Sequence, residues 1–171
     1  KNVVKSKTKK KFKIITALSV FYDLNNPNKF LKDVHDILDE NGLFLLEFAD
    51  LASLIKLNMF DTICHEHAEY YSTNVLLKMF QNNNLRLIQI NKNDINGASK
   101  QFLLTKKRSK YKSNQKNIND ILREEKLLRL DNPKTYSSFF REIKKIGRKL
   151  KIFINKQIKK NKIIHGYGAS T

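Results

Sequence analysis

The hydrophobic pattern of the first part of the chain predicts a strand, a helix and a second strand. Residues 12–18 (FKIITAL) form a short apolar, β-branched run that is typical of a buried strand. Residues 27–41 place apolar side chains on one helical face, with Pro27 at the start and Asn41-Gly42 at the end. Residues 43–48 (LFLLEF) are apolar at every position except Glu47, as in a strand covered by helices on both faces. A strand, a helix and a strand of these lengths imply a βαβ crossover and a parallel sheet.

The pattern then predicts a helix at 73–83 and two further strands, at 85–90 and 101–105. A short segment centred on Asn96-Gly97 joins these strands, so we expect them to form an antiparallel hairpin. The sheet is therefore predicted to begin with parallel strands and to end in a hairpin. In such open sheets ligands bind beyond the carboxyl ends of the parallel strands, which lie here at 17–23 and 47–50.

The last part of the chain is predicted to be helical. Residues 109–120 are polar and form a predicted linker, and helical patterns follow at 118–130 and 136–158. Lysines and arginines surround the apolar stripe of the second helix, as on a solvated helix face. Residues 162–165 predict a strand, and 166–171 (GYGAST) a glycine-rich turn. A fold does not naturally end at such a turn, so we expect the sequence to be incomplete.

Composition excludes several classes of protein. The chain of 171 residues has a formal net charge of +18, carried mostly by lysine. Lysine lacks the planar fork with which arginine reads phosphate or guanine, so we expect no nucleic-acid partner. No apolar run approaches the ~20 residues of a membrane span, and we expect no membrane association. A single cysteine, Cys64, excludes a disulfide framework and suits a reducing cytoplasm.

The richest chemistry lies in residues 60–72 (FDTICHEHAEYYS), directly after the second strand. A metal site is one interpretation, but His-x-His beside Cys64 does not match the common zinc spacings. A structural role is a second, since Ser72 is placed to cap the helix at 73–83. A catalytic acid–base cluster is the third, because a histidine beside a carboxylate is suited to take a proton next to a carbonyl.

The same segment resembles the signature of the S-adenosylmethionine (SAM)-dependent sugar C-methyltransferases, approximately F-D-x-I-Y/C-x-E-H-x-x-Y-x-S. The resemblance continues at 14–23 (IITALSVFYD) and 41–48 (NGLFLLEF), which match the fourth and fifth strands of that fold, and at 96–99 (NGAS), where the family has an H/N-G-G-S turn. Residues 166–171 match the G-Y-G-A motif that opens the family's C-terminal domain. The resemblance implies an α/β fold, the C-terminal half of a Rossmann-like class I methyltransferase sheet at 1–107. A helical linker region at 108–161 and the first strand and turn of a second α/β domain at 162–171 would follow.

The resemblance also implies roles for particular residues. His67 matches the base that removes a proton next to the ketone of a nucleotide-activated keto-deoxysugar, and Glu66 matches the carboxylate beside it. Contacts with SAM are expected from the segment Ala17-Leu18-Ser19. Contacts with the substrate are expected from Tyr70, Tyr71, Asp23, Asn96 and Tyr167.

Departures from the family pattern leave alternatives open. The loop after the fourth strand has Ser19 and Asp23 where the family often has asparagine and histidine, and Lys100-Gln101 follows Ser99 where the family often has arginine. The family's cysteine-rich zinc module and glycine-rich SAM loop have no counterpart in these residues, so we expect no metal, an incomplete SAM site and an inactive fragment. An O- or N-methyltransferase of the same fold, or a degenerate basic binding module, are the alternatives.

Overall fold

The computed structural model describes residues 11–168, which divide into two compact units between Asp131 and Asn132. The first unit holds a mixed sheet with its helices, and the second holds one long helix and the segment after it. Each unit is considered by itself.

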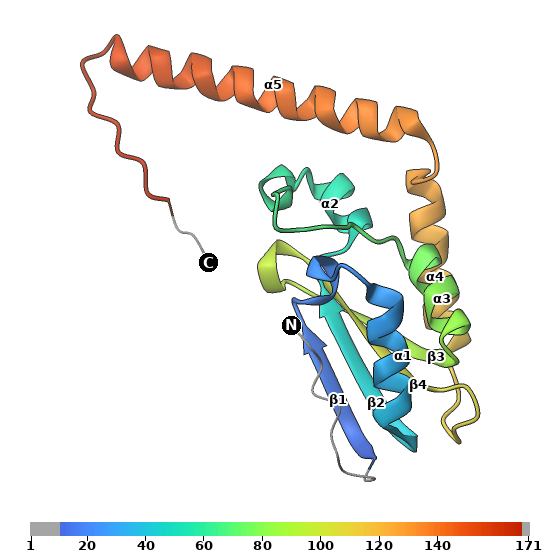
Figure 1. Ribbon diagram of the computed structural model, residues 1–171. Helices are drawn as coiled ribbons and strands as arrows, with labels where there is room; N and C mark the ends of the chain where they lie inside the picture. The colour runs from blue at the N-terminus through green and yellow to red at the C-terminus, as the bar shows by residue number, and fades with distance from the viewer. Residues whose placement is uncertain (1–10, 169–171) are drawn as a thin grey trace. The chain divides into compact units, whose positions relative to one another are not determined.

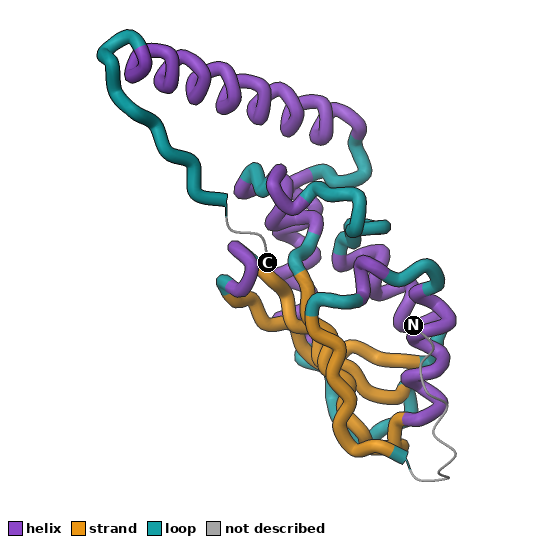
Figure 2. Tube along the Cα trace, turned by 60° about the vertical axis from the view of Figure 1, so that its left-hand side comes forward, coloured by secondary structure: helices purple, strands orange, loops and turns teal. Residues whose placement is uncertain are grey.

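The sheet of the first unit has four strands in the order β1-β2-β4-β3 (Figures 1 and 2). They are β1 (Phe12–Leu18), β2 (Leu38–Phe48), β3 (Leu85–Asn93) and β4 (Ser99–Lys106). β1 and β2 are parallel, whereas β4 runs antiparallel to both β2 and β3. The predicted arrangement of parallel strands that end in a hairpin is confirmed.

Helices precede or follow each strand, and most begin at a side chain that caps them. They are α1 (Pro27–Ile37), α2 (Leu51–Leu57), α3 (Thr73–Asn82) and α4 (Gln115–Leu128). Asn26 caps α1, Asp50 caps α2 and Ser72 caps α3, each by accepting from main-chain N–H groups of the first turn. The capping role predicted for Ser72 is confirmed, although its bond to Val75 N is long, at 3.5 Å.

Several element bounds differ from the prediction, and the helices of the first unit show why. α1 ends at Ile37 rather than at 41, because Leu38 leaves the helix in an extended conformation and is fully buried at the start of β2. α4 begins at Gln115, inside the predicted linker, because Asn114 caps it. The short helix α2 was not predicted, since seven residues are too few to show a helical period.

Aromatic side chains fill the centre of the core. The Phe48 ring lies 5.8 Å from that of Phe21 and 5.6 Å from that of Phe102, centroid to centroid. Leu31 of α1, Leu76 of α3 and several other apolar side chains belong to the same buried cluster. Burial of this apolar surface supplies most of the favourable free energy that holds the unit together.

The prediction that β1 is a buried strand is wrong. Only Ala17 is buried in this strand, and Ile14 is 69% exposed. The reason is position, because among the described residues β1 pairs with β2 alone and has no strand on its other side. The prediction that helices cover both faces of the second strand is also corrected among the described residues: Phe44 and Leu46 are fully buried, whereas Leu43 and Leu45 on the opposite face are half-buried.

The second unit contains the helix α5 (Pro133–Ile158). Its apolar stripe is largely exposed, with Leu150 and Phe153 more than half accessible. Residues 162–168 have no regular structure, so the strand expected at 162–165 is not formed; a strand needs a pairing partner, and the described residues of this unit supply none. Residues 169–171 of the predicted turn lie outside the described range, and the domain boundaries predicted at 107/108 and 161/162 stay predictions. Within residues 11–168 no helix has the length and apolarity that crossing a bilayer requires.

Candidate functional site

The turn after β1, the end of β2 and the turn between β3 and β4 meet at the carboxyl edge of the parallel strands (Figure 1). The chain leaves β1 at Ser19, which has a φ of 53°. Its main-chain N–H donates to the main-chain oxygen of Glu47 at 2.8 Å, and its hydroxyl accepts from the side-chain amide of Asn96 at 3.3 Å. Left-handed backbone is uncommon for a residue other than glycine, and these bonds hold the turn in place.

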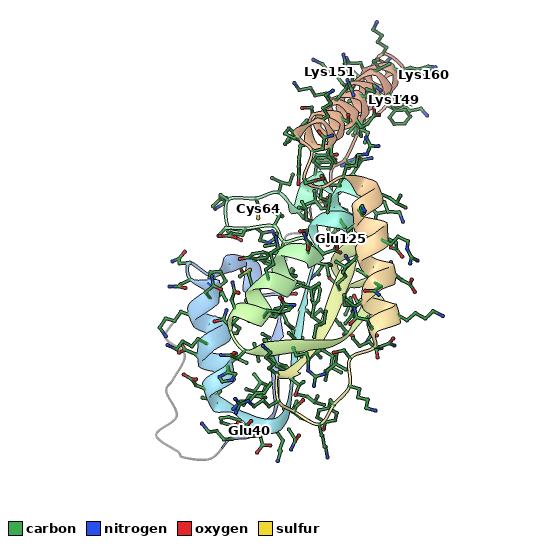
Figure 3. The ribbon with its side chains drawn as sticks, turned by 90° about the vertical axis from the view of Figure 1, so that its right-hand side faces the viewer. Glu40, Cys64, Glu125, Lys149, Lys151 and Lys160 are labelled. Atoms are coloured by element: carbon green, nitrogen blue, oxygen red, sulfur yellow. The ribbon has the colours of Figure 1, made fainter. Side chains whose placement is uncertain are left out.

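Residues 58–72 form an irregular segment that folds around the hydroxyl of Tyr70. The Tyr70 hydroxyl donates to the main-chain oxygen of Thr62 at 3.1 Å and accepts from the main-chain N–H of Cys64 at 3.3 Å. Figure 3 shows Cys64 on this segment, and the thiol is exposed. Burial raises the pKa of Tyr70, so its hydroxyl keeps its proton at neutral pH. Tyr70, predicted to contact substrate, therefore also shapes the segment.

His67 lies against a tyrosine from a distant part of the chain. The imidazole is half-buried, and its centroid lies 4.2 Å from that of the Tyr22 ring, with the planes inclined by 49°. On its other side the Tyr70 ring lies at 6.0 Å. Tyr22 belongs to the 3-10 turn Phe21–Asp23 that follows β1, so the contact joins the two loops predicted to carry the chemistry. Glu66, the residue before His67, is exposed.

Tyr71 is buried, whereas its neighbour Tyr70 is half-buried, and its predicted contact with substrate stays a prediction. It is 3% exposed, and its ring packs against Phe21 at 5.2 Å and Phe48 at 6.0 Å in the core. Its main-chain oxygen accepts from Leu51 N at 3.1 Å, which ties the end of the segment to the start of α2. Burial, then the charge of Glu69, raises the pKa of Tyr71.

The remaining residues predicted to contact SAM or substrate differ in exposure and in position. Asp23 and Asn96 are exposed at the same edge as Ser19, in keeping with the edge expected from sequence. Leu18 is 51% exposed there, whereas Ala17 is buried and offers only its backbone. Tyr167 belongs to the second unit and is 95% exposed, so its role stays a prediction.

A buried ion network lies beneath the segment. The Lys100 ammonium lies 2.8 Å from Asp50 and 2.6 Å from Glu125, and all three side chains are at most 6% exposed. The Glu125 carboxylate also accepts from the main-chain N–H and the hydroxyl of Thr73 at the start of α3, and Figure 3 labels it on α4. Burial alone lowers the pKa of Lys100, but the two carboxylates outweigh it and raise the pKa above its ordinary value.

A third buried carboxylate lies at the end of β2. Glu47 is 4% exposed and accepts from the side-chain amides of Asn93 and Gln101. Its main-chain oxygen receives the Ser19 N–H described above. Sequence reasoning assigned no role to Glu47 or to the network of Lys100, although a charged residue inside an apolar strand pattern is a signal that was available.

A cavity of about 400 Å³ lies between α2, the β3–β4 turn and α4. Its lining includes Lys56, Lys92, Ser99, Lys100, Glu125 and Leu128. None of the residues from 63 to 71 lines it, so it is separate from the site of His67.

The described residues do not gather the ligands of a metal site. Within 11–168 no three side chains of His, Cys, Asp or Glu are close enough together to hold an ion. The metal interpretation of Cys64 and its neighbouring histidines therefore has no support in the geometry.

The contacts predicted between SAM and the end of β1 stay a prediction. Leu18 and the Asp23 carboxylate are exposed there, and a carboxylate is chemically suited to an ammonium or sulfonium charge. No glycine precedes Gly42 in this sequence, so these residues contain no glycine-rich loop for the rest of the molecule.

Comparison with known proteins gives matches along the whole chain. Residues 1–90 match the model of a methyltransferase domain, and residues 94–171 match the model of a C-methyltransferase C-terminal domain. The C-methyltransferase NovU of Streptomyces niveus is 25% identical over 159 residues, which cover 93% of this chain and 38% of NovU. The chain thus spans well under half of that relative's length.

Distant similarities to solved structures accompany these matches. The magnesium protoporphyrin IX methyltransferase of Synechocystis, solved with bound SAH, is 11% identical with a TM-score of 0.44, over 58% of this chain and 47% of that one. A SAM-dependent methyltransferase of Thermotoga maritima, a possible histamine N-methyltransferase, is 15% identical with a TM-score of 0.45, over 58% and 57%. These values are too low to support an argument.

The two family models that match the sequence show the family to which the chain belongs. The methyltransferase-domain match takes in 90 of the 171 residues, and the C-methyltransferase match continues from it to the last residue. The chain therefore belongs to the SAM-dependent methyltransferase family, with a C-methyltransferase C-terminal region.

Proposed function

We propose that the protein of which this chain is part is a SAM-dependent C-methyltransferase that acts on a nucleotide-activated keto-deoxysugar. The observation that carries the proposal is the position of His67. Its half-buried imidazole lies against Tyr22, directly beside the loop after β1 that is predicted to hold the methionine end of SAM. A base at that position is suited to act on a carbon that faces the methyl donor.

His67 is the proposed base. Its neutral imidazole takes a proton from the carbon next to the substrate ketone, which leaves an enolate. SAM, when bound, would supply the methyl group: the carbon would form its new bond as the bond between the methyl group and the sulfonium sulfur breaks, which would leave S-adenosylhomocysteine. Glu66, exposed beside His67, is proposed to orient the imidazole or to polarise the ketone. Tyr70, Asp23 and Asn96 are the proposed substrate contacts.

The net charge of +18 supports an anionic substrate, because a nucleotide carries phosphate charges that basic surroundings attract. The sugar-nucleotide assignment rests on the resemblance of residues 60–72 to the sugar C-methyltransferases. The similarity to NovU supports carbon as the acceptor atom, since NovU is a C-methyltransferase.

The experiment uses the complete protein with a keto-deoxysugar nucleotide in D₂O. A base that forms an enolate exchanges the proton next to the ketone for deuterium, and mass spectrometry detects this exchange without any methyl transfer. We expect exchange in the wild type, its loss in His67→Gln, and its retention in the control His65→Gln, which changes an exposed histidine two residues away.

SAM binding is measured on the same proteins by calorimetry. SAM binding by both His67→Gln and the wild type, with exchange in the wild type alone, is the expected result. Methyl transfer to an oxygen or nitrogen acceptor without exchange favours an O- or N-methyltransferase. A complete protein that binds no SAM is a degenerate binding module, and the proposal is then wrong.

A further inference from the structure

The contact between Tyr22 and His67 joins two loops that are far apart in the sequence. Their ring centroids are 4.2 Å apart, so the rings are in van der Waals contact. A second contact between the loops is made by the backbone, where the Glu69 N–H donates to the main-chain oxygen of Tyr22 at 3.2 Å. The two contacts together fix residues 67–69 against the turn that follows β1.

The ring of Tyr22 is itself held in place. Its centroid lies 6.2 Å from that of the Phe48 ring, with the planes inclined by 82°, and so it packs on the aromatic core. Its backbone belongs to the 3-10 turn Phe21–Asp23, whose first residue is fully buried. A ring supported from the core side and by its own backbone is suited to limit the rotation of an imidazole packed on it.

The contact with Tyr22 matters for a base, because a base gains a positive charge when it takes a proton. When His67 takes a proton, it becomes an imidazolium cation. A cation within about 6 Å of an aromatic ring centre is attracted by the negative face of the ring. A tyrosine at this position therefore stabilises the protonated histidine more than the neutral one, and so favours proton abstraction.

We propose that Tyr22 is a positioning residue for His67: its ring holds the imidazole toward the loop after β1 and stabilises the imidazolium. The inference rests on the proposed function, in which His67 is the base. The aromatic ring of Tyr22, and not its hydroxyl, has this role. Burial raises the pKa of Tyr22, while interaction with the Ser19 side chain lowers it and the charges of Asp23 and Cys64 raise it; a tyrosine with a raised pKa stays neutral when His67 is protonated.

The other groups around the pair of His67 and Tyr22 must be kept constant in any test. Tyr70 packs near His67, Glu66 is its chain neighbour, and Cys64, Glu69 and Asp23 interact with Tyr22. Tyr22→Phe keeps the ring and removes only the hydroxyl, whereas Tyr22→Leu removes the ring and keeps an apolar side chain. Tyr111→Leu is the control, because it removes a half-buried tyrosine ring elsewhere in the first unit.

The first measurement is nuclear magnetic resonance of the complete protein with labelled histidine and tyrosine rings, with His67 assigned from the signal lost in His67→Gln. In the wild type we expect contacts between the ring protons of His67 and Tyr22, and an upfield ring-current shift of the His67 signals. The shift should remain in Tyr22→Phe and Tyr111→Leu and disappear in Tyr22→Leu. Absence of the ring contact in the wild type overturns the proposal, and this requires no variant to fold.

The second measurement is the rate of deuterium exchange into the keto-sugar nucleotide. For Tyr22→Leu we expect kcat to fall roughly three- to thirtyfold, the range of a cation–ring interaction, with little change in KM. Tyr22→Phe should lie within about twofold of the wild type, and so should Tyr111→Leu. A Tyr22→Phe variant as slow as Tyr22→Leu, or a change in KM alone, overturns the role of the ring. If the wild type itself shows no exchange, the proposed function fails, whereas the His67 signals still decide whether Tyr22 positions the imidazole.

Discussion

Replacing Lys100 with methionine tests whether a buried ion network holds the segment that carries His67. The variant keeps the length of the side chain but removes the ammonium between Asp50 and Glu125, which lie 2.8 and 2.6 Å away. Two carboxylates would then face each other in a region where none of the three side chains is more than 6% exposed. Breaking a buried ion pair from one side costs about 3–5 kcal/mol, because the remaining charge has neither water nor a partner.

A loss of that size is large for a domain whose whole stability is about 5–15 kcal/mol. With a denaturant dependence of about 2 kcal/mol per molar of urea, the unfolding midpoint should fall by roughly 2 M. Urea unfolding followed by circular dichroism measures it. Arg123→Met is the matched control: it removes an exposed pair with Asp120 at 3.1 Å and should change the free energy of unfolding by at most about 1 kcal/mol.

A triple variant, Lys100→Met with Asp50→Asn and Glu125→Gln, separates charge from packing. It removes the unpaired carboxylates, so it should recover much of the lost stability even though the ion pairs are gone.

The pH dependence of the free energy of unfolding gives an independent check with a definite sign. Because the pKa of Lys100 is raised above its ordinary value of 10.5, the stability from the network is fully present below pH 10.5 and is lost as the pH rises through the raised pKa. A Lys100→Met variant as stable as the wild type would refute the reasoning.

Three further changes test other parts of the structure. Glu47→Gln should lower the free energy of unfolding by about 1–3 kcal/mol, measured by thermal denaturation, because a buried carboxylate that accepts from two amides is replaced by a group that also donates. Gly42→Ala should lower the free energy of unfolding by about 1–3 kcal/mol in the same melts, since the new Cβ would lie 2.8 Å from the main-chain oxygen of Phe12. Gly147→Ala is the contrasting variant: its Cβ would meet no neighbouring atom within 4 Å, so it should raise the stability of the helix by up to about 1 kcal/mol. Ile14→Lys should reduce aggregation, measured by light scattering, with a change in stability within about 0.5 kcal/mol, because this side chain is 69% exposed on the edge strand.

The arrangement of the sheet was predictable because each step has a strong local signal. A strand–helix–strand pattern implies parallel pairing, and a short Asn-Gly segment implies a hairpin, and the structure has both. Burial was less predictable. The apolar run at 12–18 looks like an inner strand, but exposure depends on what pairs with it, and β1 has a partner on one side only.

The sequence predicted where the candidate site lies in the fold, but not which side chains contact one another in it. Two adjacent tyrosines, Tyr70 and Tyr71, have the same local signal, yet one hydroxyl organises the loop and the other ring lies in the core. Which one turns inward depends on Phe21 and Phe48, which come from elsewhere in the chain. For the same reason the contact of Tyr22 with His67, across 45 positions of sequence, has no local pattern that predicts it.

The segment that carries His67 is fixed by its ends and by its aromatic rings rather than by secondary structure. Asp50, which caps the preceding helix α2, pairs with Lys100, and Thr73, which follows the segment, is held by Glu125, so one buried network holds the residues on both sides. Between α2 and α3 the regular structure is the 3-10 turn Phe60–Thr62, and contacts of Tyr70 and Tyr22 order the residues after it. A helix or strand would satisfy its backbone internally but would dictate the direction of every side chain. An irregular segment anchored at both ends leaves Glu66 open to solvent while its neighbour His67 is held against a ring, which is the combination that a positioned base with access to substrate requires.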